Sequence, residues 1–140
     1  MSDPIVVFDP DATADLCNRV QTIVDNYNVA KTGRADWYPV AFFLRGENGE
    51  VLGGLLGDIW GAWLHVRTLA VAAPVRGRGF GKELMMRAEL YAVERGCTDA
   101  FLDTFSFQAR PFYENLGYHI FGMLKDHPPG HQHYFMTKHL

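Results

Sequence analysis

The chain has little cysteine, no long apolar run and no excess of basic charge, and each shortage argues against a class of protein. Its two cysteines, Cys17 and Cys97, lie far apart in 140 residues, which indicates reduced thiols rather than a disulfide scaffold. The formal net charge of -3 argues against a nucleic-acid partner. No apolar stretch approaches the roughly 20 residues of a membrane span, and the first residues lack a secretion-signal pattern. We therefore expect a cytoplasmic protein without a membrane partner.

The order of apolar patterns predicts one α/β domain over residues 1–140. Helical spacing of apolar residues appears in two segments, from Asp11 or Thr13 to about Tyr27 and from about 79 to 95. Asn48-Gly49, between two apolar stretches, is a strong hairpin signal. Strands that first cluster and then alternate with helices favour a mixed sheet around one core. The expected strands are 5–8, 37–45, 51–60, 62–71, 97–105, 118–124 and 134–138.

The most informative motif is the run Arg76-Gly77-Arg78-Gly79-Phe80-Gly81-Lys82, between an expected strand and an expected helix. Glycines let backbone N–H groups converge on an anion, and a helix N-terminus adds positive partial charge. A Walker A loop fails on spacing, because Lys82 is followed by Glu83 rather than Ser or Thr. The dinucleotide fingerprint fails because it needs a glycine at Lys82. The run fits Arg/Gln-x-x-Gly-x-Gly/Ala, although this pattern alone leaves a turn without a ligand as the alternative.

This loop and a second motif resemble those of the GCN5-related N-acetyltransferases (GNAT family). The second motif, Ala109-Arg110-Pro111-Phe112-Tyr113-Glu114-Asn115-Leu116-Gly117-Tyr118, is similar to A-x-x-F-Y-E-x-x-G-[FY] and follows the loop by one helix and one strand. The resemblance spans nearly the whole chain. It implies a mixed, mostly antiparallel sheet that is splayed open at its middle and flanked by helices. It also implies that acetyl-CoA is the co-substrate and that no metal is needed.

The resemblance assigns roles to three groups of residues. The backbone of the run from Arg76 to Lys82 would hold the pyrophosphate of acetyl-CoA. Leu69, Ala70 and Val71 would pair with the pantetheine arm, and one of their N–H groups would polarise the thioester carbonyl. Tyr113 would be the general acid that protonates the leaving thiolate. An ordinary tyrosine, with a pKa of ~10, is a weaker acid than a thiol of ~8.5, so this transfer costs roughly 2 kcal/mol.

The group that takes the proton of the acceptor amine is not identified by the sequence. An alkylammonium ion has a pKa of ~10.4 and is mostly protonated at neutral pH, so a base or a water chain must accept that proton. The strand before the loop carries Arg67 where members of the family often have an acidic residue. His127, His131 and His133 are not accompanied by acidic or cysteine ligands, so we expect no metal site there. The candidates for the base are Asp58, His65, Asp103, His131 or water.

The sequence thus predicts an N-acetyltransferase that transfers an acetyl group from acetyl-CoA to a primary amine of a small molecule. The amine would attack directly in a ternary complex. A protein or peptide N-acetyltransferase and a CoA-binding sensor without turnover remain as alternatives. The hairpin at Asn48-Gly49 and the last strand are exposed edges through which a homodimer could form.

Overall fold

The computed structural model describes residues 2–140. The chain divides into two compact units, and the boundary between them in the sequence falls between Ala35 and Asp36. The first unit consists of α1 (Ala14–Thr32) and a preceding segment without helix or strand. Thr13 begins the helix, because its hydroxyl accepts a hydrogen bond from the N–H of Leu16 at 3.2 Å. Gly33, with a φ of 70°, ends it by donating its N–H to the carbonyl of Val29.

Two expectations for this first unit are wrong. The strand expected at 5–8 does not form among the described residues. The helix continues past Tyr27 to Thr32, because Gly33 is the first residue in the left-handed conformation that ends a helix. No residue of α1 is buried, and no helix in the described part of the chain has the length and apolar character needed to cross a membrane.

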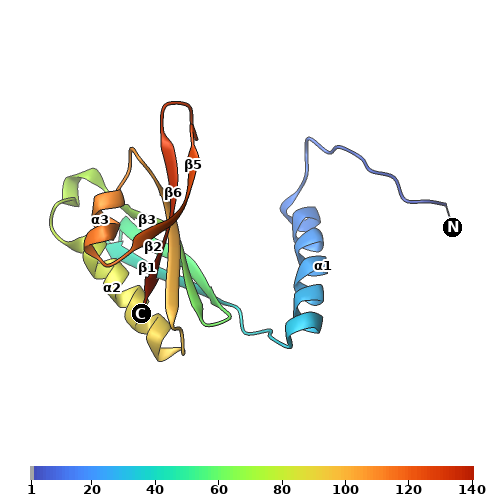
Figure 1. Cartoon of the computed structure of the whole chain (residues 1–140), viewed down its shortest axis with the longest axis horizontal. Helices are drawn as coiled ribbons and strands as arrows, with labels where there is room; N and C mark the ends of the chain where they lie inside the picture. The colour runs from blue at the N-terminus through green and yellow to red at the C-terminus, as the bar shows by residue number, and fades with distance from the viewer. Residues whose placement is uncertain (1) are drawn as a thin grey trace. The chain divides into compact units, whose positions relative to one another are not determined.

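The second unit is built on a six-stranded sheet with the order β1-β2-β3-β4-β6-β5 (Figure 1). Neighbouring strands are antiparallel except for β3 and β4, which are parallel. This confirms the expected mixed, mostly antiparallel sheet flanked by helices. The elements are β1 (Tyr38–Arg45), β2 (Val51–Trp60), β3 (Trp63–Val71), the 3-10 turn η1 (Ala73–Val75), α2 (Phe80–Glu94), β4 (Asp99–Phe105), α3 (Arg110–Asn115), β5 (His119–Lys125) and β6 (Gln132–His139).

The sheet is splayed between its two parallel strands. β3 and β4 pair only from Trp63 to Val66 on one side and from Asp99 to Leu102 on the other. β3 then runs on to Val71 without β4 beside it. The separation leaves an opening in the middle of the sheet.

One face of the sheet packs against α2 to form the core. The helix buries Leu84, Met85, Ala88 and Ala92 on one side, whereas Val93 is 49% exposed. The fully buried side chains from the strands include Leu55, Leu64, Leu102 and Met136. Burying each of these stabilises the fold by about 1.5–3 kcal/mol relative to exposure.

A polar group ties α2 to the sheet beside this core. The hydroxyl of Tyr118 donates to Glu89 at 3.2 Å, and Lys138 also donates to Glu89. Burial, and then the charge of Glu89, raises the pKa of Tyr118 far above its ordinary value. The tyrosine therefore remains a neutral hydrogen-bond donor, and its bond to Glu89 links the chain after α3 to α2.

Candidate active site

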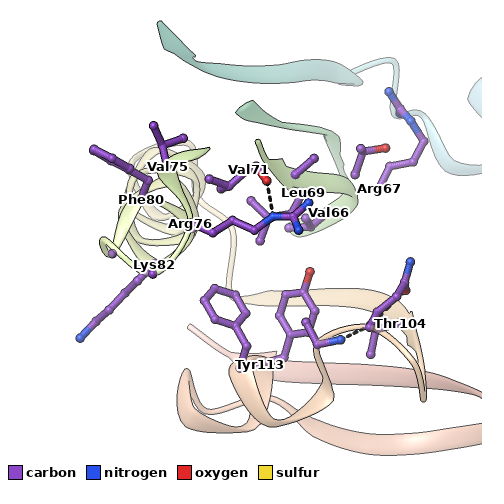
Figure 2. A pocket seen from close by; sticks show the side chains of 18 of the residues that line it. Val66, Arg67, Leu69, Val71, Val75, Arg76, Phe80, Lys82, Thr104 and Tyr113 are labelled. Atoms are coloured by element: carbon purple, nitrogen blue, oxygen red, sulfur yellow. Dashed lines mark hydrogen bonds between the residues drawn. The ribbon is translucent and has the colours of Figure 1, made fainter. Parts of the chain in front are cut away.

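A cavity of about 940 Å³ lies where β3 and β4 separate (Figure 2). Its walls come from β3 beyond Val66, from the glycine-rich loop, from the end of β4 and from α3. The structure therefore brings together residues that the sequence analysis took from two separate motifs. The predicted site residues that line the cavity are Leu69, Ala70, Val71, Arg76, Gly77, Gly79, Phe80, Gly81, Lys82 and Tyr113.

The glycine-rich loop presents unpaired backbone N–H groups to this cavity. Gly79 has a φ of 86°, a left-handed conformation that costs other residues roughly 1–2 kcal/mol. Glu83 is the first residue of α2 to bond back, to the carbonyl of Gly79 at 3.0 Å. The N–H groups of the first turn, Phe80 to Lys82, therefore have no acceptor within the helix. A helix N-terminus of this kind, opening a cavity, suits a pyrophosphate.

The three cations of the loop are placed differently. Arg76 crosses to β3, where its Nε donates to the carbonyl of Val71 at 2.7 Å (Figure 2). Lys82 lines the cavity at its outer edge, with its side chain directed away from Tyr113. Arg78 is not among the lining residues, and its guanidinium lies 5.2 Å from the ring centre of Phe80. The assignment of Arg78 to the pyrophosphate site stays a prediction, and only the backbone of Arg78 could make that contact.

Within the described residues, the backbone of Leu69–Val71 has one edge without a neighbouring strand, on which Arg76 occupies the carbonyl of Val71. On its other edge this segment pairs with residues 53–55 of β2. Toward the cavity no strand in residues 2–140 pairs with it, because β4 has already diverged. An extended polar ligand could add to this edge as a further strand, as the sequence analysis expects for the pantetheine arm.

A turn between β4 and α3 positions the second motif. The side-chain oxygen of Gln108 accepts hydrogen bonds from the N–H of Phe105 at 2.9 Å and from the hydroxyl of Thr104 at 3.3 Å. The hydroxyl of Thr104 accepts in turn from the N–H of Ala109 at 3.4 Å. The sequence analysis missed this role of Gln108, because glutamine is not among the residues that typically signal a turn.

Tyr113 reaches the cavity from α3. Its side chain is 8% exposed, and its hydroxyl points toward β3 (Figure 2). Burial, and then the negative charge of Asp103, raises the pKa of Tyr113 to about 12. The gap to a thiol of ~8.5 then corresponds to roughly 5 kcal/mol rather than the 2 kcal/mol expected for an ordinary tyrosine. Proton transfer from Tyr113 would therefore be easier if its pKa fell during the reaction.

Of the four residues weighed as the base, Asp103 is the one that lines the cavity in the described part of the chain. Asp58 and His65 pair across β2 and β3, with 3.8 Å between Oδ2 and Nδ1, and Asp58 also contacts Arg67 at 3.5 Å. His131 lies in the loop after β5, with its Nδ1 3.4 Å from the hydroxyl of Ser106. The geometry of the cavity therefore favours Asp103 over the other three residues as the base.

Asp103 has a partner that the sequence analysis missed. His133 of β6 places its Nε2 2.6 Å from Oδ2 of Asp103 and its Nδ1 3.2 Å from Nδ1 of His127. No set of three or more His, Cys, Asp or Glu side chains in residues 2–140 is arranged to hold a metal ion. The pairing had no signal in the sequence, because it depends on which strand lies beside β4.

Comparison with known proteins places these features in a family. Residues 15–118 match the acetyltransferase (GNAT) family. Blasticidin-S acetyltransferase of Streptomyces morookaense is 42% identical over 71% of this chain and 74% of its own. An acetyltransferase of Agrobacterium fabrum is 36% identical over 70% and 72%. The crystal structure of an acetyltransferase from Bacillus cereus superposes with a TM-score of 0.81, at 32% identity, over 96% of this chain and 98% of that one.

Proposed function

We propose, given that the chain belongs to the GNAT family and is an acetyl-CoA-dependent N-acetyltransferase, that it acetylates a primary amine of a small molecule. The amine attacks the thioester directly, with both substrates bound at once. The observation that carries this proposal is the single cavity shared by the glycine-rich loop, the free edge of β3 and Tyr113.

The residues of the cavity fit the shape and charge of acetyl-CoA, which supplies an activated acetyl group. The first turn of α2 would hold the pyrophosphate through the N–H groups that lack acceptors, and Gly81 keeps that approach open. A Cβ at Gly81 would lie 3.4 Å from the ring of Phe112, so a larger residue would crowd the turn. The free edge of Leu69–Val71 would bind the extended arm and offer an N–H to the carbonyl oxygen.

Tyr113 would act as the general acid in this arrangement. Its hydroxyl faces β3 across the cavity, and its high pKa keeps it protonated at neutral pH. The proton goes from the phenol to the departing thiolate sulfur, and the tyrosinate recovers a proton from the nitrogen that has formed the new C–N bond. One proton is released for each ammonium ion consumed.

A relative supports the choice of acceptor class. One relative is named for blasticidin S, a small molecule, and it matches 71% of the length of this chain. We therefore infer that the acceptor is a compact amine, such as an amine-bearing antibiotic, a polyamine or an amino acid.

An acceptor panel tests this proposal. Thiol release from acetyl-CoA is measured with blasticidin S, a streptothricin, spermidine, lysine and a peptide with a free N-terminus. The proposal predicts turnover with at least one small amine and at least tenfold lower kcat/KM for the peptide. A preference for the peptide would favour a protein or peptide N-acetyltransferase. If acetyl-CoA binds and no amine is acetylated, a CoA sensor becomes the better account.

A further inference from the structure

The face of β4 opposite the core carries an acidic residue that reaches the cavity. Side chains alternate along a strand, so Ala100, Leu102 and Thr104 point into the core and Asp103 points to the other face. Tyr113 approaches the same cavity from the α2 side. The two groups therefore face the cavity from opposite sides of the sheet, through the gap between β3 and β4.

The partner of Asp103 is held firmly in place. The side chain of His133 is 10% exposed and lies between two phenyl rings. Its ring centre is 4.2 Å from that of Phe105, in a stacked arrangement, and 4.6 Å from that of Phe135. These contacts fix the imidazole plane, so its Nε2 stays directed at Asp103.

The chemistry of the groups sets the direction of the hydrogen bonds that link Asp103, His133 and His127. An ionised carboxylate only accepts, so Nε2 of His133 must donate to Oδ2 of Asp103. In a neutral imidazole the other nitrogen is then an acceptor, so Nδ1 of His127 donates to Nδ1 of His133. The structure shows no hydrogen bond to Oδ1 of Asp103 within residues 2–140. Oδ1 is thus left available to a ligand.

We propose that Asp103 accepts the proton of the acceptor ammonium ion, and that His133, oriented by His127, positions its carboxylate for this step. The proposal rests on the proposed amine acetylation. The N–H bond of the ammonium ion breaks, its electron pair stays on nitrogen as the nucleophilic lone pair, and a new O–H bond forms on Asp103. The side chain of Asp103 is 36% exposed, so the proton leaves to solvent once the acetyl group has been transferred and the thiolate protonated.

This step also prepares Tyr113. Burial is the main cause of the high pKa of Tyr113, and the negative charge of Asp103 adds to it. Once Asp103 has taken the proton, that charge is gone and the pKa of Tyr113 falls. Tyr113 therefore becomes a better acid after the amine has been activated, when the thiolate needs its proton. Base and acid act in the order that the reaction requires.

A matched control lies on the same two strands. Asp99 of β4 pairs with His139 of β6 at 3.1 Å, so the chemistry of the pair is the same. This pair is outside the cavity lining, and the side chain of His139 is 81% exposed. Asp99→Asn therefore tests the loss of such a pair without affecting the site.

The first test compares Asp103→Asn with Asp99→Asn, using the best acceptor of the panel. At pH 7.5 we expect kcat/KM to fall by about 100-fold in Asp103→Asn and less than twofold in Asp99→Asn. At pH 9.5 the neutral fraction of an amine of pKa ~10.4 is about 100-fold larger, so the deficit shrinks to about tenfold or less. The titratable or charged groups that face Asp103 are His133 of β6, with His127 behind it, Tyr113 of α3, and Arg67 of β3, which lines the same cavity and contacts Asp58. A deficit that is the same at both pH values, or one no larger than that of Asp99→Asn, overturns the proposal.

The second test needs no substrate. Nitrogen-15 NMR of the resting protein at pH 8 should show His133 as the neutral tautomer protonated on Nε2, and Asp103→Asn should alter its signals while Asp99→Asn does not. A doubly protonated His133 overturns the proposal, because Asp103 would then be locked in an ion pair.

A third test measures the activity of two variants of His133. His133→Gln, which keeps a donor at this position, should retain most of the activity that His133→Leu loses. If the wild-type enzyme acetylates no amine, the proposed function fails; if it does and these variants do not differ, only the role of Asp103 fails.

Discussion

Two Asp–His pairs at opposite ends of β4 and β6 share their chemistry but not their surroundings. Asp99 and His139 lie near the surface, while Asp103 and His133 lie beside the cavity, with His133 between two phenyl rings. Only the second pair has a tyrosine whose pKa responds to its charge. The difference teaches that such a pair gains a role from a buried histidine and from a facing cavity, since the hydrogen bond itself occurs at both ends.

The sharpest way to break this comparison is to remove the acid that faces Asp103. Tyr113→Phe should lower kcat about 100-fold, because general acid catalysis is typically worth 10²–10⁴-fold. Acetyl-CoA affinity should change less than twofold. The control is Tyr91→Phe on α2, whose ring contacts Phe42 outside the cavity lining. Steady-state kinetics and calorimetry measure both quantities, and an unchanged kcat would remove Tyr113 from the mechanism.

A second comparison sets the two ends of α2 against each other. Gly79 precedes the helix at a φ of 86° and Gly96 follows it at 87°, and neither would place a Cβ within 4 Å of another residue. Replacing either by alanine should cost roughly 1–2 kcal/mol of unfolding free energy. Gly79→Ala should also raise the Kd of acetyl-CoA about tenfold, because the loop backbone must shift, while Gly96→Ala leaves it unchanged. Equal Kd values for the two variants would contradict the pyrophosphate site.

A third prediction uses the pH dependence of stability. The pKa of Tyr113 is about 12 in the folded protein and ~10 when unfolded, so above pH 10 the unfolded state ionises first. The unfolding free energy should therefore fall with rising pH, and the share due to Tyr113 is about 1.4 kcal/mol for each pH unit between 10 and 12. Urea denaturation at pH 9, 10 and 11 checks the slope, which should be shallower in Tyr113→Phe. An identical slope in that variant would mean that Tyr113 is not buried in solution.

The smallest effect is expected at the exposed pair. A hydrogen bond from Thr98, then one from His139, lowers the pKa of Asp99 below its ordinary value. This group stabilises the fold above that ordinary value, and the contribution is lost as the pH falls through the folded pKa. Asp99→Asn should thus lower Tm slightly at pH 7, less at pH 3, and less again in high salt, which screens exposed charges. A Tm difference that grows toward acid pH would reverse the sign of this argument.

Most of the sheet could be predicted from the sequence, because its signals are local. Two apolar stretches around Asn48-Gly49 predicted the first hairpin, and apolar spacing predicted α2. The strand expected at 5–8 was wrong because a short apolar run without a pairing partner has no reason to be extended. The end of α1 was misplaced because Gly33 decides it, rather than the loss of apolar periodicity at Tyr27.

The site could be predicted only in part, and the limit is again physical. The glycine-rich loop and the motif around Tyr113 are each a continuous stretch of sequence, so their residues could be named in advance. The pair of Asp103 and His133 could not, because β5 intervenes in sequence while β6, not β5, lies beside β4. The depth of Tyr113, and hence its pKa of about 12, also depends on packing from several elements.

The measurement that tests the central claim most directly is the titration of acetyl-CoA into the protein, with CoA, ATP and NAD in parallel. The account predicts one acetyl-CoA bound per chain, comparable binding of CoA, and much weaker binding of ATP and NAD. It also predicts protection of backbone amides 77–82 and 69–71 from hydrogen exchange in the complex. Failure to bind acetyl-CoA, or protection confined to other segments, would contradict the assignment of this cavity.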